Sequence, residues 1–258
     1  MSFSVDWLAT RRLADHRSRN ADIAARLKHH FEDRASVRVL DLGCGTGSNM
    51  AATSKLLPNN QHWTLVDNDL ALLHRIEPVN NIPFETQQAD LAHDLDALFN
   101  QQFDLVTASA LFDLAGSTFT QELVRRTSQI SAAFFTVLTY DGHEGWLPAH
   151  KYDAQVLAAF HADQHTDKGL GPALGPEATK FLASAFTEAG YETQVGRSDW
   201  QLFDAKDNAL IRMLADGIHA ATAPVLGDTA VSWHEERVKA SSVRIGHLDL
   251  IALPPKAR

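Results

Sequence analysis

The sequence predicts an α/β sandwich of three layers, built on a mostly parallel sheet with one antiparallel edge strand. From residue 37 onward, short apolar segments of strand length alternate with segments of helical length. Strands separated by helices are joined by right-handed crossovers, which make the strands parallel and cover both faces of the sheet. Two further strands at the end of the chain indicate the antiparallel edge.

The chain is expected to form a single domain over residues 1–258 with a helical cap over residues 1–35. Its composition, 45% hydrophobic and 21% charged, is typical of a globular protein with one large core. In the cap, Ile23, Leu27 and Phe31 are four residues apart, which places them on one face of a helix. We find no internal repeat or linker that would divide the chain.

The predicted strands follow the hydrophobic pattern in chain order. Each is an apolar run bounded by polar or glycine-containing segments. They span residues 37–42, 63–66, 84–87, 103–108, 133–138, 191–203 and 243–253. The later helices are expected over residues 153–165, 177–190, 207–221 and 229–240.

Residues 143–176 interrupt this alternation with prolines, glycines and histidines around one predicted helix. The segment follows the fifth strand, at the edge of the sheet where α/β folds bind ligands. We therefore interpret it as an insertion that forms most of a substrate lid.

Charge and cysteine content narrow the function classes. The net charge of −9, with no cluster of lysine and arginine, would repel nucleic acid and fits a small-molecule substrate better. The chain has neither a secretory signal nor an apolar run of membrane-spanning length, so a cytoplasmic protein without membrane contact is expected. Its single cysteine, Cys44, excludes an internal disulfide and a cysteine-based zinc cluster. Oligomeric state is not predicted.

The strongest motif is a glycine-rich loop directly after the first strand. Gly43, Gly45 and Gly47 alternate along VRVLDLGCGTGSN. Glycines let the backbone turn sharply and approach a ligand, and the helix that follows points free N–H groups at it. A nucleotide-type ligand is therefore expected beyond the carboxyl end of this strand.

The loop spacing separates two ligand classes. The dinucleotide fingerprint needs its third glycine at position 48, where Ser48 stands. Asp41 precedes the loop, and its carboxylate would repel a pyrophosphate but attract the ammonium group of a methionine moiety. These features favour S-adenosylmethionine, and a nicotinamide-dependent oxidoreductase is the alternative.

Two further carboxylates follow the next strands. Asp67 ends the second strand, 20 residues after Gly47, where an acidic side chain can accept both ribose hydroxyls. Asp90 follows the third strand beside Leu91, a place suited to the adenine ring. Either aspartate could instead cap the helix that follows it.

Together these segments resemble the class I S-adenosylmethionine-dependent methyltransferases. DLGCGTG, LVDND, QAD and FDLVTASALFDL occur in that order over roughly residues 37–140. The resemblance implies a Rossmann-like fold with a seven-stranded sheet whose seventh strand is antiparallel. It also implies S-adenosylmethionine as cofactor, with the following residues around it: Asp41, Gly43, Cys44, Gly45, Gly47, Asn49, Asp67, Asn68, Asp90, Leu91, Ser109 and Ala110.

Departures from the family's subtypes limit the acceptor. Enzymes that methylate amino groups of nucleobases or glutamine carry an Asn/Asp-Pro-Pro-aromatic string after the fourth strand, where this chain has residues 109–113, SALFD. Cytosine-carbon enzymes need a cysteine there, and Cys44 lies in the glycine loop instead. The segment TDKGLGPALGP is similar to a feature of a bacterial subgroup of small class I methyltransferases. This resemblance does not indicate a substrate. A small molecule or metabolite is expected as acceptor, and a non-catalytic cofactor-binding protein is the further alternative.

If the acceptor must lose a proton, His143 is the predicted base, because it lies just beyond the fifth strand and histidine titrates near neutral pH. Arg19, among the arginines of the first helix, is the predicted partner of the cofactor carboxylate. The predicted substrate contacts are Phe112, Asp113, Tyr140, Trp146, Asp167 and Lys168. His161 and His165 have a metal-like spacing, but a solvated helix face explains it better and no metal is predicted.

Overall fold

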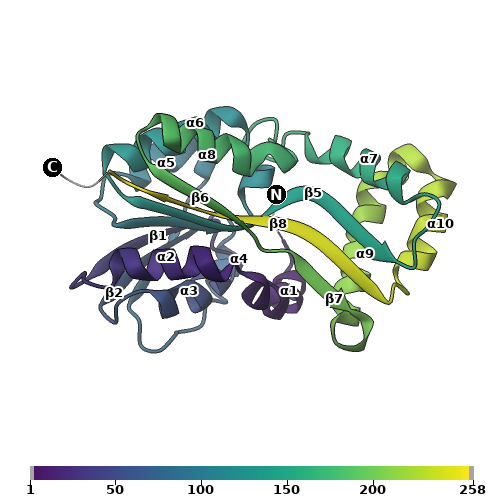
Figure 1. Ribbon diagram of the computed structural model, residues 1–258, viewed down its shortest axis with the longest axis horizontal. Coiled ribbons are helices and arrows are strands. Elements are labelled where there is room, and N and C mark those ends of the chain that lie inside the picture. Colours follow the sequence, from purple (N-terminus) through teal and green to yellow (C-terminus); the bar gives the residue numbers. More distant parts are fainter. Residues whose placement is uncertain (1–2, 256–258) are drawn as a thin grey trace.

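The sheet at the centre of the molecule has eight strands in a computed structural model that describes residues 3–255 (Figure 1). The strands are β1 (Val37–Leu42), β2 (Gln61–Asp67), β3 (Phe84–Gln88), β4 (Leu105–Ser109), β5 (Ala133–Leu147), β6 (Glu192–Arg197), β7 (Trp200–Phe203) and β8 (Ser242–Leu253). Their order is β3-β2-β1-β4-β5-β8-β6, and β7 pairs with β8 beyond the end of β6.

Ten α-helices and three short 3-10 helices connect the strands of this part of the chain. The α-helices are α1 (Val5–Ser18), α2 (Ala21–Phe31), α3 (Ser48–Thr53), α4 (Leu70–Leu73), α5 (Leu91–Leu98), α6 (Ser117–Gln129), α7 (Asp153–Gln164), α8 (Ala178–Glu188), α9 (Asp204–Leu226) and α10 (Asp228–Arg237). The 3-10 helices are η1 (Ser54–Leu56), η2 (Phe112–Leu114) and η3 (Gly175–Glu177).

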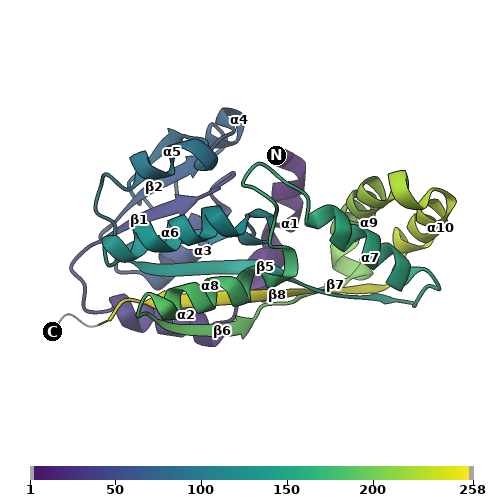
Figure 2. The ribbon, with the colours of Figure 1, turned by 90° about the horizontal axis from the view of Figure 1, so that it is seen from above.

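Helices cover both faces of the sheet, as Figures 1 and 2 show. Side chains alternate along β1, so Leu40 and Leu42 join the core under α5, α6 and α8, whereas Val37 and Val39 join the core under α2. The predicted apolar face of α2 is fully buried in that second core. The three-layer α/β class predicted from the sequence is confirmed.

Strand pairing follows the predicted pattern, with two differences of detail. Strands β1 to β5 are parallel neighbours, and β8 runs antiparallel to β5, β6 and β7. The antiparallel strand therefore has β6 outside it at the edge of the sheet. The strand predicted over 191–203 is two strands, because Ser198 and Asp199 leave the ladder; the Asp199 carboxylate binds Arg197 and Arg244 there. The sheet thus has eight strands where seven were predicted.

Strand β5 is longer than predicted. Instead of ending at residue 138 it continues to Leu147, and residues 144–147 pair with β8. Two register shifts accommodate this length, and Leu138 at φ 58° and Gly142 at φ 85° lie at or beside them. The first residues of the predicted 143–176 insertion are therefore strand.

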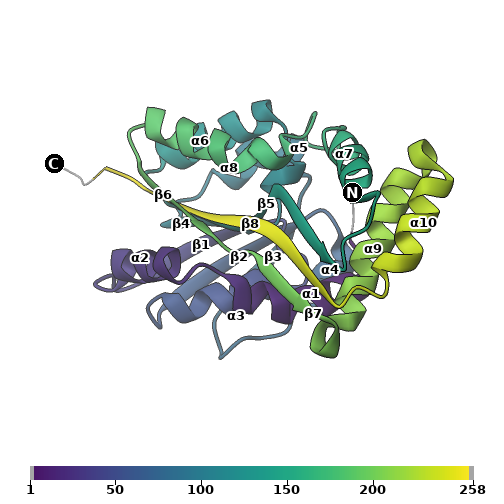
Figure 3. The same ribbon diagram turned by 45° about the vertical axis from the view of Figure 1, so that its right-hand side comes forward.

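Helices α7, α9 and α10 gather around the far ends of β5, β7 and β8 (Figure 3). Trp146 packs edge to face against Trp233, with ring centroids 5.4 Å apart, and Arg237 donates to the Pro148 carbonyl. We call this group, α7, α9 and α10 with the strand ends they cover, the distal lobe. Among residues 3–255, α9 is the one helix long and apolar enough to cross a membrane, and 28% of its most apolar stretch is buried.

Candidate functional site

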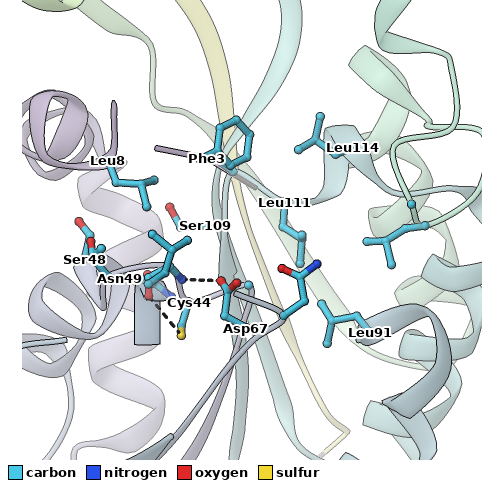
Figure 4. A pocket seen from close by; sticks show the side chains of 18 of the residues that line it. Phe3, Leu8, Cys44, Ser48, Asn49, Asp67, Leu91, Ser109, Leu111 and Leu114 are labelled. Carbon is cyan, nitrogen blue, oxygen red and sulfur yellow. Dashed lines mark hydrogen bonds between the residues drawn. The ribbon is translucent and has the colours of Figure 1, made fainter. Parts of the chain in front are cut away.

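A cavity of about 270 Å³ lies at the carboxyl ends of the parallel strands (Figure 4). The glycine loop after β1, the end of β2, the start of α5 and the end of β4 line it. Helix α1 and residues 168–170 complete the lining. The strand ends thus bring segments that are far apart in sequence to one place, as expected for this class of sheet.

Backbone geometry explains the glycines of the loop. Gly43, Gly45 and Gly47 have φ values of 61°, 54° and 78°, which side chains other than glycine rarely adopt. A Cβ at Gly45 would also lie 3.1 Å from the Leu8 side chain. The Cys44 N–H donates to the Val66 carbonyl, which ties the loop to β2. Gly43, Cys44 and Gly45 line the cavity, whereas Gly47 is the N-cap that precedes α3.

The Asp67 carboxylate lies at the floor of the cavity and is 9% exposed. One oxygen accepts the Gly45 N–H at 2.8 Å, and the other accepts the Asp69 N–H at 3.0 Å. Each carboxylate oxygen can accept a second hydrogen bond, so both keep capacity for a ligand. The helix cap considered for Asp67 is provided by Asp69, whose side chain accepts the Ala71 N–H.

Asp90 combines the two roles considered for it. Its side chain caps α5 by accepting the Ala92 N–H at 2.9 Å, and the residue also lines the cavity. Leu91, Asn68, Leu72 and Ala89 also line the cavity. This part of the cavity offers apolar surface with polar groups at its rim.

Asp41 does not line the cavity. It is fully buried behind the glycine loop, and burial raises its pKa to about 7. Asn49 donates to one Asp41 oxygen at 2.7 Å, whereas the other has no partner within residues 3–255. The direct contact with a methionine ammonium group implied for Asp41 is therefore not prepared in this structure.

Arg19 is likewise placed behind the loop, which corrects its predicted position in the cavity. Its guanidinium donates to Thr53 at 2.7 Å and to Asn49 at 3.0 Å, and burial lowers its pKa. Arg19 and Asp41 both bind Asn49, so these three side chains support the loop from inside the core. Asn49 itself reaches the cavity.

Four predicted substrate residues are core residues instead. Phe112 is 0% exposed and contacts Phe134 edge to face, because η2 turns its ring inward after β4. Burial raises the pKa of Asp113 to about 6. Tyr140 and Trp146 both donate to the buried Glu144 carboxylate, at 3.0 Å each. All four lie outside the cavity lining.

The other two predicted substrate residues are neighbours with different roles. Lys168 lines the cavity, and its Nζ lies 2.8 Å from Asp163. Asp167 does not line it and accepts the N–H groups of Gly169 and Gly171, at 2.7 and 3.1 Å. Asp167 therefore shapes the loop that brings residues 168–170 to the cavity.

His143 is not at the cavity. Its side chain is 78% exposed and contacts the Asp141 carboxylate at 3.1 Å. The prediction assumed that β5 ends before this residue, whereas the longer strand carries it away from the site. His161 and His165 bind Tyr140 and the Ala173 carbonyl, and no group of potential metal ligands occurs within residues 3–255.

Helix α1 contributes the main set of cavity residues that the sequence did not reveal. Leu8, Arg11 and Asp15 follow one another at helical spacing on the face turned to the cavity. Phe3 adds an apolar side chain before the helix, and Figure 4 labels it with Leu8 among the residues that line the cavity. The helical spacing of Leu8, Arg11 and Asp15 could have indicated a shared face. Because α1 is mostly polar, however, its sequence does not show which face packs against the rest of the protein.

Comparison with known proteins gives one family and a set of related folds. Residues 39–132 match a family described as a methyltransferase domain. The malonyl-[acyl-carrier protein] O-methyltransferase of Bacillus cereus is 29% identical over 129 residues. That alignment covers 48% of this chain and 45% of the relative, so the chain spans less than half of its length.

Two solved structures share the fold over nearly the whole chain. A putative methyltransferase from Bacillus halodurans has a TM-score of 0.54 at 14% identity, covering 92% of this chain and 100% of that one. A cyclopropane-fatty-acyl-phospholipid synthase-like protein from Lactobacillus casei has a TM-score of 0.52 at 15% identity, covering 94% and 99%. These similarities establish the fold.

Proposed function

We propose that the chain is a class I S-adenosylmethionine-dependent methyltransferase and that it methylates a small molecule or metabolite. The observation that carries the proposal is the cavity itself. The glycine loop, Asp67 and the Asp90–Leu91 pair come from three consecutive strand ends and meet there.

The residues after β1, β2 and β3 would bind the methionine part, the ribose and the adenine of the cofactor, in that order. Gly43 and Gly45 allow close approach of the methionine part, and Asp67 accepts the ribose hydroxyls. Leu72, Ala89 and Leu91 cover the adenine ring, with Asp90 at its polar edge.

The chemistry requires positioning more than proton transfer by the protein. The bound cofactor supplies a methyl group on a positively charged sulfur. Transfer of that methyl group to an acceptor atom would leave S-adenosylhomocysteine. Ser109, Ala110 and Leu111 line the cavity beyond β4, where they exclude water and orient the acceptor.

We also propose a substrate lid that uses fewer residues of the segment 143–176 than the sequence predicted. Within residues 143–176, the cavity lining draws on Lys168, Gly169 and Leu170, whereas Trp146 and Val156 are buried in the core that includes the distal lobe. Helix α1 lines the same cavity through Leu8, Arg11 and Asp15. The lid is therefore the 168–170 loop together with α1.

Calorimetric titration with S-adenosylhomocysteine, with NADH in parallel, tests the cofactor class. Micromolar binding of the former is expected, and Asp67→Ala should weaken it about tenfold or more because charged hydrogen bonds to the ribose are lost. Asp96→Ala is the matched control, since Asp96 pairs with Arg126 on the surface. Binding of NADH without a response to S-adenosylhomocysteine would refute the proposal and favour an oxidoreductase.

A further inference from the structure

Arg11 presents a partly unpartnered guanidinium group to the cavity. Its Nε donates to Asp15 at 2.9 Å, and its side chain is only 11% exposed. Within residues 3–255, its two terminal nitrogens have no hydrogen-bond partner. A buried guanidinium with free N–H groups facing a cavity is suited to an anionic ligand.

The surroundings of Arg11 fix the plane of this group. The guanidinium carbon lies 4.9 Å from the ring centroid of Trp200 and 5.6 Å from that of Trp7. Asp15 is held in turn, because Trp200 Nε1 donates to its second oxygen at 3.1 Å. The two indole rings and the Asp15 carboxylate therefore hold the Arg11 guanidinium in one orientation without a ligand. Such a guanidinium matches the two oxygens of a carboxylate better than a lysine ammonium would.

Arg11 lies at the end of the cavity opposite to the proposed adenine site. Asp67 and Asp90 follow β2 and β3, whereas Trp200 begins β7, which pairs with β8 on the other side of β1. Electrostatics agree with this position. Burial lowers the pKa of His247 on β8 to about 3, and the positive charge of Arg11 adds to that shift. The guanidinium thus lies on the side of the cavity towards β7 and β8, away from the strands that carry Asp67 and Asp90.

Both cations in the cavity lining, Arg11 and Lys168, are ion-paired to an aspartate, but they differ in the donors they keep free. Lys168 has a single nitrogen, which lies 2.8 Å from the Asp163 carboxylate, whereas Arg11 donates to Asp15 through Nε and keeps its two terminal nitrogens available. We infer that Arg11 is a specificity-determining residue that binds a carboxylate group of the methyl acceptor. This inference rests on the proposed function, and it narrows the acceptor to carboxylate-bearing small molecules.

The test uses protein saturated with S-adenosylhomocysteine and a series of simple acids, acetate to adipate, each paired with its uncharged amide. Calorimetry should show at least one acid binding more tightly than its amide. Arg11→Lys should weaken that acid about tenfold or more, because the bidentate hydrogen bonds are lost while the charge stays. Arg12→Lys, at the exposed neighbouring position, should leave the affinity unchanged.

Other results overturn the inference in distinguishable ways. If no acid in the series is preferred over its amide by the wild-type protein, Arg11 does not select a carboxylate acceptor, whether or not the variant folds. If Arg11→Lys weakens S-adenosylhomocysteine but not 5′-methylthioadenosine, which lacks the amino-acid part, Arg11 binds the cofactor's carboxylate instead. Failure of the wild-type protein to bind S-adenosylhomocysteine at all would refute the proposed function rather than this assignment.

Discussion

Replacing Asp41 by asparagine removes a buried carboxylate without removing its hydrogen bond. Asn49 donates to an Asp41 oxygen at 2.7 Å, and the amide oxygen of Asp41→Asn can accept the same bond. Burial raises the pKa of Asp41 from 3.8 to about 7 in the folded protein. A difference of about three pKa units, at about 1.4 kcal/mol each, corresponds to about 4 kcal/mol.

The sign of the pH dependence follows from proton binding. Between about pH 4 and pH 7 the folded protein keeps a proton on Asp41 that the unfolded chain has released. The free energy of unfolding therefore falls as pH rises through this window, by up to about 4 kcal/mol from this group, and levels off above it. In Asp41→Asn this contribution is absent, so the curve is flatter.

Urea unfolding at pH 5, 6, 7 and 8 measures the effect without cofactor. The difference in unfolding free energy, Asp41→Asn minus wild type, should increase from pH 5 to pH 7 and then stay constant. Asp96→Asn, at a surface ion pair, should show no such trend. Parallel curves for the wild type and Asp41→Asn would refute the account of a neutral, buried Asp41.

Three further predictions concern the loop and the core. Asp113→Asn should also flatten the stability profile, in a window that ends near pH 6 because burial raises that pKa to about 6; equal slopes in urea unfolding would contradict this. Gly45→Ala should lower the unfolding free energy by about 1–2 kcal/mol from its positive φ, and more if Leu8 cannot move. Gly217→Ala in α9, where nothing lies within 4 Å, should be neutral or stabilising, and thermal melting compares the two. Phe112→Ala should cost about 3–5 kcal/mol of stability with unchanged affinity for S-adenosylhomocysteine; a selective loss of ligand binding would return Phe112 to the site.

The fold could be predicted because its signal is local and repeated. Apolar strands such as residues 37–42 are separated by helical segments, and this alternation fixes a parallel sheet. The errors arose where the sheet bends. Leu138 has a positive φ without being glycine, so nothing in the sequence marks the register shift that lets β5 continue. The break at Ser198 and Asp199 depends on Arg244, which is distant in sequence.

The cavity was predictable only on its cofactor side. Gly43, Gly45, Asp67 and Asp90 are each attached to a strand end, so placing the strands places these residues. Arg11 reaches the cavity through packing of α1 onto the sheet, which no short-range pattern encodes. The prediction for His143 was wrong because it relied on sequence distance alone. His143 follows the predicted end of the fifth strand closely, but β5 continues to Leu147 and carries this residue away from the cavity.

A crystal structure of the protein with S-adenosylhomocysteine tests the central claim most directly. The account predicts adenine packed against Leu91 and the ribose hydroxyls within hydrogen-bonding distance of Asp67, with the homocysteine part over Gly43 and Gly45. A ligand bound elsewhere, or one that leaves Asp67 without a ribose contact, would contradict it.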